Sequence, residues 1–154
     1  MTLAAWDATL SSLGSVAFDT NALIYLLERR EPWFPYVQRA IETVESGRVR
    51  GVISTTVEME MLVGPLRNGD VGAYERVEMF LLHRPNLSVV EVSRAIARRA
   101  ADIRARTGLS PLDSIVVATA LSADCDVIIG NDAMIGSKNI GVPYLYLNDY
   151  VVRS

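Results

Sequence analysis

Residues 16–27 read Val-Ala-Phe-Asp-Thr-Asn-Ala-Leu-Ile-Tyr-Leu-Leu and change character at Asp19. The apolar run Val16–Phe18 is typical of a short buried strand, and Thr20–Leu27 has its leucines spaced for one face of a helix. A strand that leads directly into a helix is the repeating unit of α/β folds. The segment therefore predicts an α/β fold in which Asp19 lies at the carboxyl end of a strand.

The same alternation continues on both sides of this segment. We expect further strands at residues 49–54, 87–90, 127–129 and 144–147. Helices are predicted around and between them, over residues 2–12, 35–46, 55–64, 71–82, 93–107 and 110–122. The helix that starts at residue 55 is expected to stop near Gly64-Pro65. This pattern favours a mainly parallel sheet within a single domain, residues 1–154.

Composition and charge limit the class of protein. Half of the 154 residues are hydrophobic, as in a packed globule, and no apolar run reaches the roughly 18 residues that span a bilayer. The start of the chain lacks the pattern of a signal peptide, so we expect a cytoplasmic protein with no membrane segment. The net charge of −3 argues against a high-affinity nucleic-acid scaffold but allows an enzyme that binds nucleic acid transiently. The single cysteine, Cys125, excludes an internal disulfide and a cysteine zinc cluster.

Four acidic residues lie at the ends of apolar runs: Asp19, Glu60, Asp113 and Asp132. Two of them follow predicted strands, and ligands of open α/β sheets bind beyond the carboxyl ends of the strands. Carboxylate oxygens are the ligands that Mg²⁺ and Mn²⁺ prefer. Four unpaired carboxylates repel one another, whereas a divalent cation between them removes the repulsion. Metal-assisted hydrolysis of phosphodiester bonds is therefore the leading hypothesis.

Each of these acids also has an ordinary structural interpretation when it is taken alone. Asp19 and Asp132 are typical helix-capping or turn residues, and Asp113 lies in the first turn of a predicted helix, where the helix dipole favours an anion. Glu58 and Glu60 cannot both face one site, because residues two apart on a helix point in nearly opposite directions. Periodicity leaves the choice between these two glutamates open, with a slight preference for Glu60.

Four segments in this order give the chain a resemblance to the PIN-domain family, especially to the small VapC-type toxins of bacterial toxin–antitoxin pairs. They are Phe18–Asn21, Glu60–Pro65, Leu112–Ala120 and Asn131-Asp132, and the resemblance extends from Val16 to Tyr146. It implies a three-layer α/β/α sandwich around a parallel sheet of four or five strands. It also implies a ribonuclease that depends on Mg²⁺ or Mn²⁺, the toxin of a type II pair.

The resemblance assigns roles to particular residues. Asp19, Glu60, Asp113 and Asp132 would be the catalytic, metal-binding acids, and the spacing of Glu60 from the Leu-Val-Gly segment selects it over Glu58. The side chains of Asn21 and Asn131 would hold a carboxylate or a water in place. A cognate antitoxin that blocks the site, an RNA substrate and a homodimer are the implied partners. Two positions depart from the family pattern: Gly130 replaces a Ser or Thr, and Val57 replaces a Thr.

An arginine-rich helix is predicted between Ser93 and Thr107. Its apolar residues indicate a helix that packs on the core and exposes its arginines to solvent. The alternative is that Arg94 and Arg98 contact an RNA backbone.

Two other functional classes fit the sequence less well than the nuclease. A non-catalytic RNA- or protein-binding module with the same fold has no need to hold repelling acids together. Phospho-acceptor receivers and haloacid-dehalogenase-type phosphatases need acidic pairs after the first strand, where this chain has Asp19-Thr20-Asn21.

Overall fold

A five-stranded parallel sheet forms the centre of the protein in the computed structural model, which describes residues 2–151. The strands lie in the order β3-β2-β1-β4-β5. Their bounds are β1 Ser15–Phe18, β2 Arg50–Ser54, β3 Leu87–Val90, β4 Val127–Gly130 and β5 Tyr144–Tyr146. The predicted parallel α/β fold is confirmed. Residues 1 and 152–154 of the expected domain 1–154 lie outside the described part.

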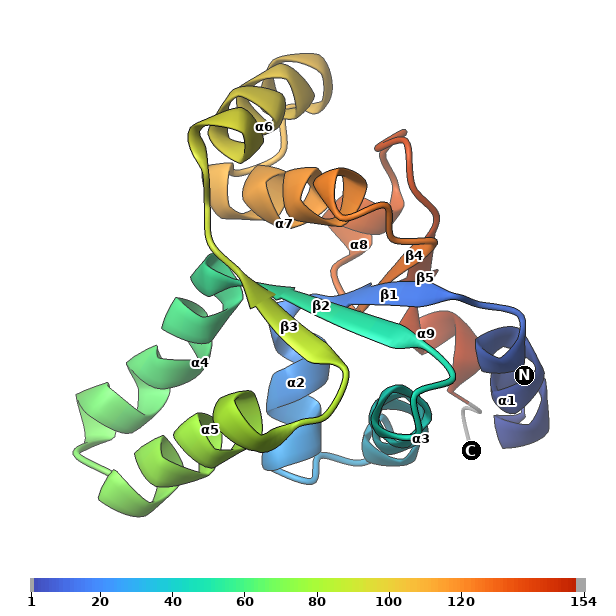
Figure 1. The fold of residues 1–154 in the computed structure, drawn as a ribbon, viewed down its shortest axis with the longest axis vertical. Helices are drawn as coiled ribbons and strands as arrows, with labels where there is room; N and C mark the ends of the chain where they lie inside the picture. The colour runs from blue at the N-terminus through green and yellow to red at the C-terminus, as the bar shows by residue number, and fades with distance from the viewer. Residues whose placement is uncertain (1, 152–154) are drawn as a thin grey trace.

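Helices cover both faces of this sheet and so complete the expected three layers (Figure 1). The helices α6 and α7 lie on one face, and α2, α3 and α5 lie on the other. The bounds of all described helices are α1 Leu3–Ser11, α2 Thr20–Leu27, α3 Phe34–Glu45, α4 Thr55–Asn68, α5 Val71–His83, α6 Arg94–Thr107, α7 Pro111–Ser122, α8 Ala133–Gly136 and α9 Leu147–Tyr150.

The central strands β1 and β4 are buried along their whole length. Such strands are covered by helices on both faces, which is why they read as continuous apolar runs rather than alternating ones. The register pairs Phe18 with Ile129, and the Asp19 amide donates to the Ile129 carbonyl at 2.9 Å. Because the strands are parallel and adjacent, the residues that follow them, Asp19 and Asp132, emerge at the same edge of the sheet.

Most helix ends lie where their capping residues predict them. Ser93, Asp70 and Ser110 accept backbone hydrogen bonds at the starts of α6, α5 and α7. The expected stop of α4 at Gly64-Pro65 is wrong, because the helix continues to Asn68 and ends at Gly69, whose φ of 61° is left-handed. A proline removes one N–H from the helix and crowds the carbonyl four residues earlier, and α4 continues through Pro65 on a largely exposed turn despite both effects.

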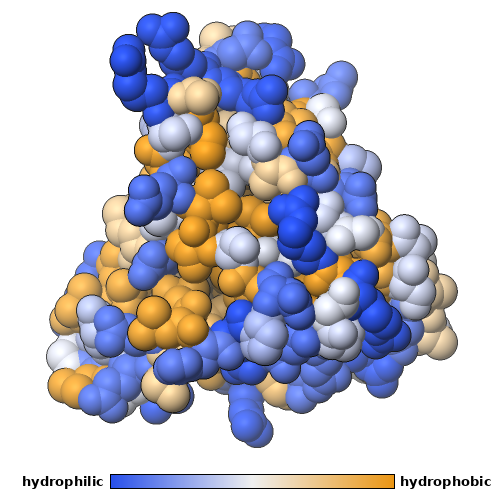
Figure 2. All heavy atoms as spheres, in the orientation of Figure 1, coloured by the Kyte–Doolittle hydropathy of each residue, from blue (hydrophilic) through white to orange (hydrophobic). Residues whose placement is uncertain are grey.

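The molecular surface differs between helices. Figure 2 shows hydrophobic side chains gathered over α4 and α5 and hydrophilic ones over α6. The exposed apolar side chains of α4 and α5 are Met59, Val63, Leu66, Val71, Met79 and Leu82. Within residues 2–151, no helix is long and apolar enough to cross a membrane.

Candidate active site

Asp19 is the most buried of the four predicted acids, with 5% of its surface exposed. It follows β1 directly and caps α2, where its Oδ1 accepts a hydrogen bond from the Thr20 amide at 2.8 Å. Among residues 2–151, its other oxygen, Oδ2, receives only a long contact of 3.4 Å from the hydroxyl of Tyr144. A buried carboxylate usually needs several donors or a cation to remain ionised, and Asp19 is short of both.

Glu60 lies beside Asp19, and Glu58 does not. The Glu60 carboxylate accepts a hydrogen bond of 2.8 Å from the hydroxyl of Thr20, the residue after Asp19. The carboxylate of Glu58 instead acts on α5, where Glu78 and, to a lesser extent, Glu58 raise the pKa of Tyr74. The two glutamates therefore occupy different faces of α4, as helical geometry requires.

Asp113 and Asp132 complete the group from two further elements. Asp113 is half-buried in the first turn of α7, with its amide bonded to the capping hydroxyl of Ser110 at 3.2 Å. Asp132 is also half-buried and caps α8, where its Oδ1 accepts from the amides of Met134 and Ile135. The four acids thus lie at the starts of α2, α7 and α8 and in the second turn of α4.

The electrostatics of these groups connect them into one site. The pKa of Asp19 is raised to about 7, chiefly by burial; the charges of Asp113, Asp132 and Glu60 add to this rise, and the Thr20 amide opposes it. Burial also raises the pKa of Asp113, and the charge of Asp132 adds to that effect. Each of the three other acids therefore acts on Asp19, which lies at the centre of the group.

The two predicted asparagines differ in their surroundings. Asn21 is exposed, whereas Asn131 is half-buried in the segment between β4 and α8. The Asn131 amide donates to the Tyr25 hydroxyl and to Oδ1 of Asn148, and its oxygen accepts from the Asn148 amide at 3.0 Å. Within the residues that the structure describes, Asn131 is thus bonded to Tyr25 and Asn148 and not to the four acids, so its direct effect is to fix the chain just before Asp132.

Two polar residues at this site were missed by sequence reasoning. Thr20 orients Glu60, and its place next to Asp19 was the available signal. Tyr144 in β5 accepts a hydrogen bond from the Asp132 amide at 2.9 Å and reaches Asp19 with its hydroxyl. Burial raises the pKa of this phenol, and the Asp19 charge raises it further. Nothing in the local sequence around Tyr144 marks it, because its contacts depend on strand register.

A sequence model of the PIN domain family matches residues 16–138 of this chain. The match covers well over half of the chain and includes all four acids. The chain belongs to the PIN domain family. This confirms the family resemblance that the sequence motifs indicated, and the five-stranded sheet flanked by helices agrees with it.

Several solved structures share the fold of this PIN domain. A chain of a toxin–antitoxin complex from Klebsiella pneumoniae is 24% identical, with a TM-score of 0.66 over 89% of this chain and 99% of its own. A chain of VapBC2 from Rickettsia felis, bound to a fragment of promoter DNA, is 12% identical, with a TM-score of 0.67 over 86% and 98%. VapC20 from Mycobacterium tuberculosis, a toxin that cleaves the sarcin–ricin loop, is 15% identical, with a TM-score of 0.64 over 79% and 93%. Among curated proteins, none matches this chain significantly.

The donor set of this PIN domain suits a hard divalent cation. All four acids offer oxygen ligands, and the ion pairs formed within residues 2–151 involve other side chains. In that part of the chain no three acidic, histidine or cysteine side chains converge into a ready coordination shell. The raised pKa of Asp19 reflects repulsion from the neighbouring carboxylates together with burial. A cation at this position would relieve both.

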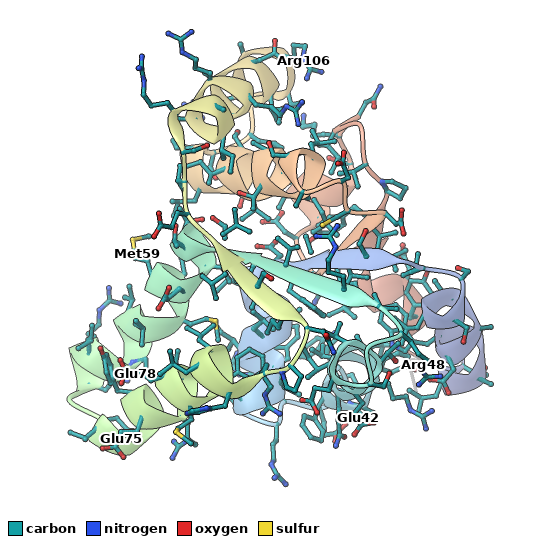
Figure 3. All side chains as sticks on the ribbon, viewed as in Figure 1. Glu42, Arg48, Met59, Glu75, Glu78 and Arg106 are labelled. Atoms are coloured by element: carbon teal, nitrogen blue, oxygen red, sulfur yellow. The ribbon has the colours of Figure 1, made fainter. Side chains whose placement is uncertain are left out.

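The arginines of α6 separate into two groups. Arg99, Arg104 and Arg106 bond to Ser122, the Leu109 carbonyl and Asp102, respectively. Figure 3 shows Arg106 at the outer end of α6, where it pairs with Asp102 at 3.0 Å. Arg94 and Arg98 are exposed and make no hydrogen bond or ion pair within residues 2–151. Their guanidinium groups are therefore free to meet an anionic ligand.

Proposed function

We propose that this PIN domain is a metal-dependent endoribonuclease and the VapC-type toxin of a type II toxin–antitoxin pair. The observation that carries the proposal is the buried Asp19 carboxylate at the carboxyl edge of the sheet, with three further acids acting on it. A protein that only needed stability would gain from an uncharged side chain at this position. The retained charge is explained by the binding of Mg²⁺ or Mn²⁺.

The chain's own residues would divide the work of hydrolysis. Asp19, Asp113, Asp132 and Glu60 would hold the cation, and the Thr20 hydroxyl orients Glu60 by donating to it. When bound, such a cation lowers the pKa of a water and stabilises negative charge on the phosphate. The carboxylate nearest that water would orient it or accept its proton. Arg94 and Arg98 would contact the RNA backbone, since guanidinium groups bind phosphate bidentately.

The proposed antitoxin partner is supported by the apolar surface of α4 and α5. A groove between α2, α4 and α5 is lined by Ile24, Met61 and Val77, and it also includes Glu60. Met59, which Figure 3 shows on the outer side of α4, is 48% exposed. A partner segment on this surface would bury apolar area and reach the acidic site. We further propose that the toxin is a homodimer and that it acts in the cytoplasm, where its RNA substrate is found.

RNA cleavage by the purified chain tests the proposed activity. The protein, free of any partner, is incubated with total cellular RNA in Mn²⁺ or Mg²⁺, with EDTA and the Asp19→Asn variant as controls. Fragments that require both the metal and Asp19 are expected, and mapping their ends would identify the target. An intact RNA pool together with no metal binding would instead favour a non-catalytic RNA- or protein-binding module with the same fold.

A further inference from the structure

The hydroxyl of Tyr144 occupies space that a side chain at residue 130 would fill. A Cβ atom added to Gly130 would lie 2.3 Å from this hydroxyl and 2.8 Å from the Cβ of Asp19. Distances below 3.0 Å are not tolerated by real Cβ atoms. Glycine at the end of β4 is therefore required by the close approach of Tyr144 and Asp19.

The ring of Tyr144 lies in a slot that the fold forms for it. The register pairs Tyr144 with Ile128, so the side chain extends along β4 past Ile128 to reach Gly130. On the other side, a Cβ on Gly136 of α8 would lie 3.3 Å from the ring. Two glycines from neighbouring elements thus leave room for one aromatic ring, and the ring directs its hydroxyl at the acidic site.

This hydroxyl connects two acids that come from different elements. It accepts a hydrogen bond of 2.9 Å from the amide of Asp132, and it points its proton toward Oδ2 of Asp19 at 3.4 Å. Asp19 follows β1 and Asp132 follows β4, so the phenol bridges the ends of both central strands. A neutral hydroxyl is suited to this position because it adds no charge to a site that already holds four acids.

We infer that Tyr144 is a positioning residue that fixes Asp19 and Asp132 relative to each other and so prepares the site for a divalent cation. The inference rests on the proposed function for its metal. Groups that orient metal-binding side chains typically contribute about 10- to 100-fold in metal affinity. A hydroxyl that acts through a long contact to Asp19 should lie at the lower end of that range.

The test compares Tyr144→Phe with Tyr146→Phe in the full chain. Both changes remove one phenol oxygen from β5, but the Tyr146 hydroxyl bonds to Asn148 and not to an acid. The ring that remains after Tyr144→Phe would still fill the slot beside Gly136, so the fold is retained. One readout is Mn²⁺ affinity by calorimetry, and the second is the hydrogen-exchange rate of the Asp132 amide, measured by NMR without metal.

We expect Tyr144→Phe to weaken Mn²⁺ binding about 10-fold and to accelerate exchange of the Asp132 amide. Tyr146→Phe should change neither. Unchanged Mn²⁺ affinity in Tyr144→Phe would overturn the inference even if exchange accelerates, because the bond would then be only structural. Weaker binding without faster exchange would also overturn it. If the wild-type chain binds no Mn²⁺ at all, the proposed function fails, and the positioning role fails with it.

Discussion

Aspartates at the two ends of the β1–β4 pair have opposite surroundings. Asp126 precedes β4 and is exposed, and its Oδ2 accepts hydrogen bonds from the amides of Gly14 at 2.7 Å and Ser15 at 3.1 Å. Asp19 follows β1, is buried, and has one backbone donor and three acidic neighbours in the described part of the chain. At one end of the strand pair an aspartate thus links the two strands through hydrogen bonds. At the other end an aspartate carries a negative charge that the fold does not compensate.

A structural acid can be told from a functional one by whether the fold itself stabilises its charge. Two backbone donors and contact with water make the Asp126 charge favourable, so its role is complete within the fold. The Asp19 charge is unfavourable in the fold alone, because burial and like charges both raise its pKa. When the fold does not offset the free-energy cost of ionising a buried carboxylate, a bound ligand is indicated.

The largest expected effect is on catalysis, where a substitution of Asp19 should abolish most activity and a substitution of Asp126 should not. Asp19→Asn keeps an oxygen that can accept from the Thr20 amide but removes the central charge. We expect kcat/KM for RNA cleavage to fall at least about 100-fold, because metal-held charge stabilisation contributes several kcal/mol. Asp126→Asn is the matched control and should stay within about two-fold in the same steady-state assay.

Glu60 and Glu58 of α4 should differ in their effect on activity, because only Glu60 lies in the acidic group. Glu60→Gln should lower kcat/KM at least about 10-fold, because Glu60 lies beside Asp19 and is bonded to Thr20. Glu58→Gln, two residues away on the other face of α4, should have little effect on the same cleavage rate. The reverse order of effects would place the fourth ligand at Glu58 and contradict the assignment.

Stability of the metal-free protein should respond with opposite sign at the two ends. The folded-state pKa of Asp19, about 7, lies above its unfolded value, so between pH 4 and 7 the native state binds more protons than the unfolded state. The free energy of unfolding should therefore fall as pH rises through this window and level off above it. At pH 8, Asp19→Asn should be more stable than wild type by about 1–3 kcal/mol.

Asp126→Asn should be less stable by about 1 kcal/mol at the same pH, since it weakens two charge-assisted hydrogen bonds. Urea unfolding of both variants and the wild type in EDTA, at pH 5 and pH 8, gives the comparison. A loss of stability in Asp19→Asn at pH 8 would mean that its charge is already compensated within the fold.

The smallest effect is expected on α6, which lies outside the acidic group. Replacing both Arg94 and Arg98 by Ala should weaken RNA binding about three- to ten-fold and lower its salt dependence, because each guanidinium releases counterions from the RNA. Arg106→Ala is the control, since Arg106 is paired with Asp102. Filter-binding titrations at several salt concentrations measure both quantities. If the double variant and the wild type have equal RNA affinity and equal salt dependence, the exposed arginines of α6 contact only solvent.

Local patterns were sufficient for most of the fold. Apolar runs and capping residues such as Ser93 and Asp70 predict elements that the structure contains, because they act within a few residues of the chain. The end of α4 was missed at Pro65, where an exposed turn tolerates the lost hydrogen bond. The short helices α8 and α9 were also missed, since four residues carry no periodicity.

The candidate site could be predicted only in part. Asp19 and Asp132 follow strands, so their shared edge can be derived from a parallel sheet. The bond from Thr20 to Glu60 and the bridge from Tyr144 to Asp19 join residues 40 and 125 positions apart. The first depends on the packing of α2 against α4, and the second depends on the register of β4 and β5. Gly130, which departs from the family pattern, is explained only when the Tyr144 hydroxyl is seen beside it.

Calorimetric titration with Mn²⁺ at pH 8 tests most directly whether the acidic end of the β1–β4 pair is a cation site. At this pH Asp19 is largely ionised even without metal. Wild type and Asp126→Asn should bind with the same affinity, and Asp19→Asn should bind at least about 10-fold more weakly. Equal binding by all three proteins, or none by the wild type, would contradict the account.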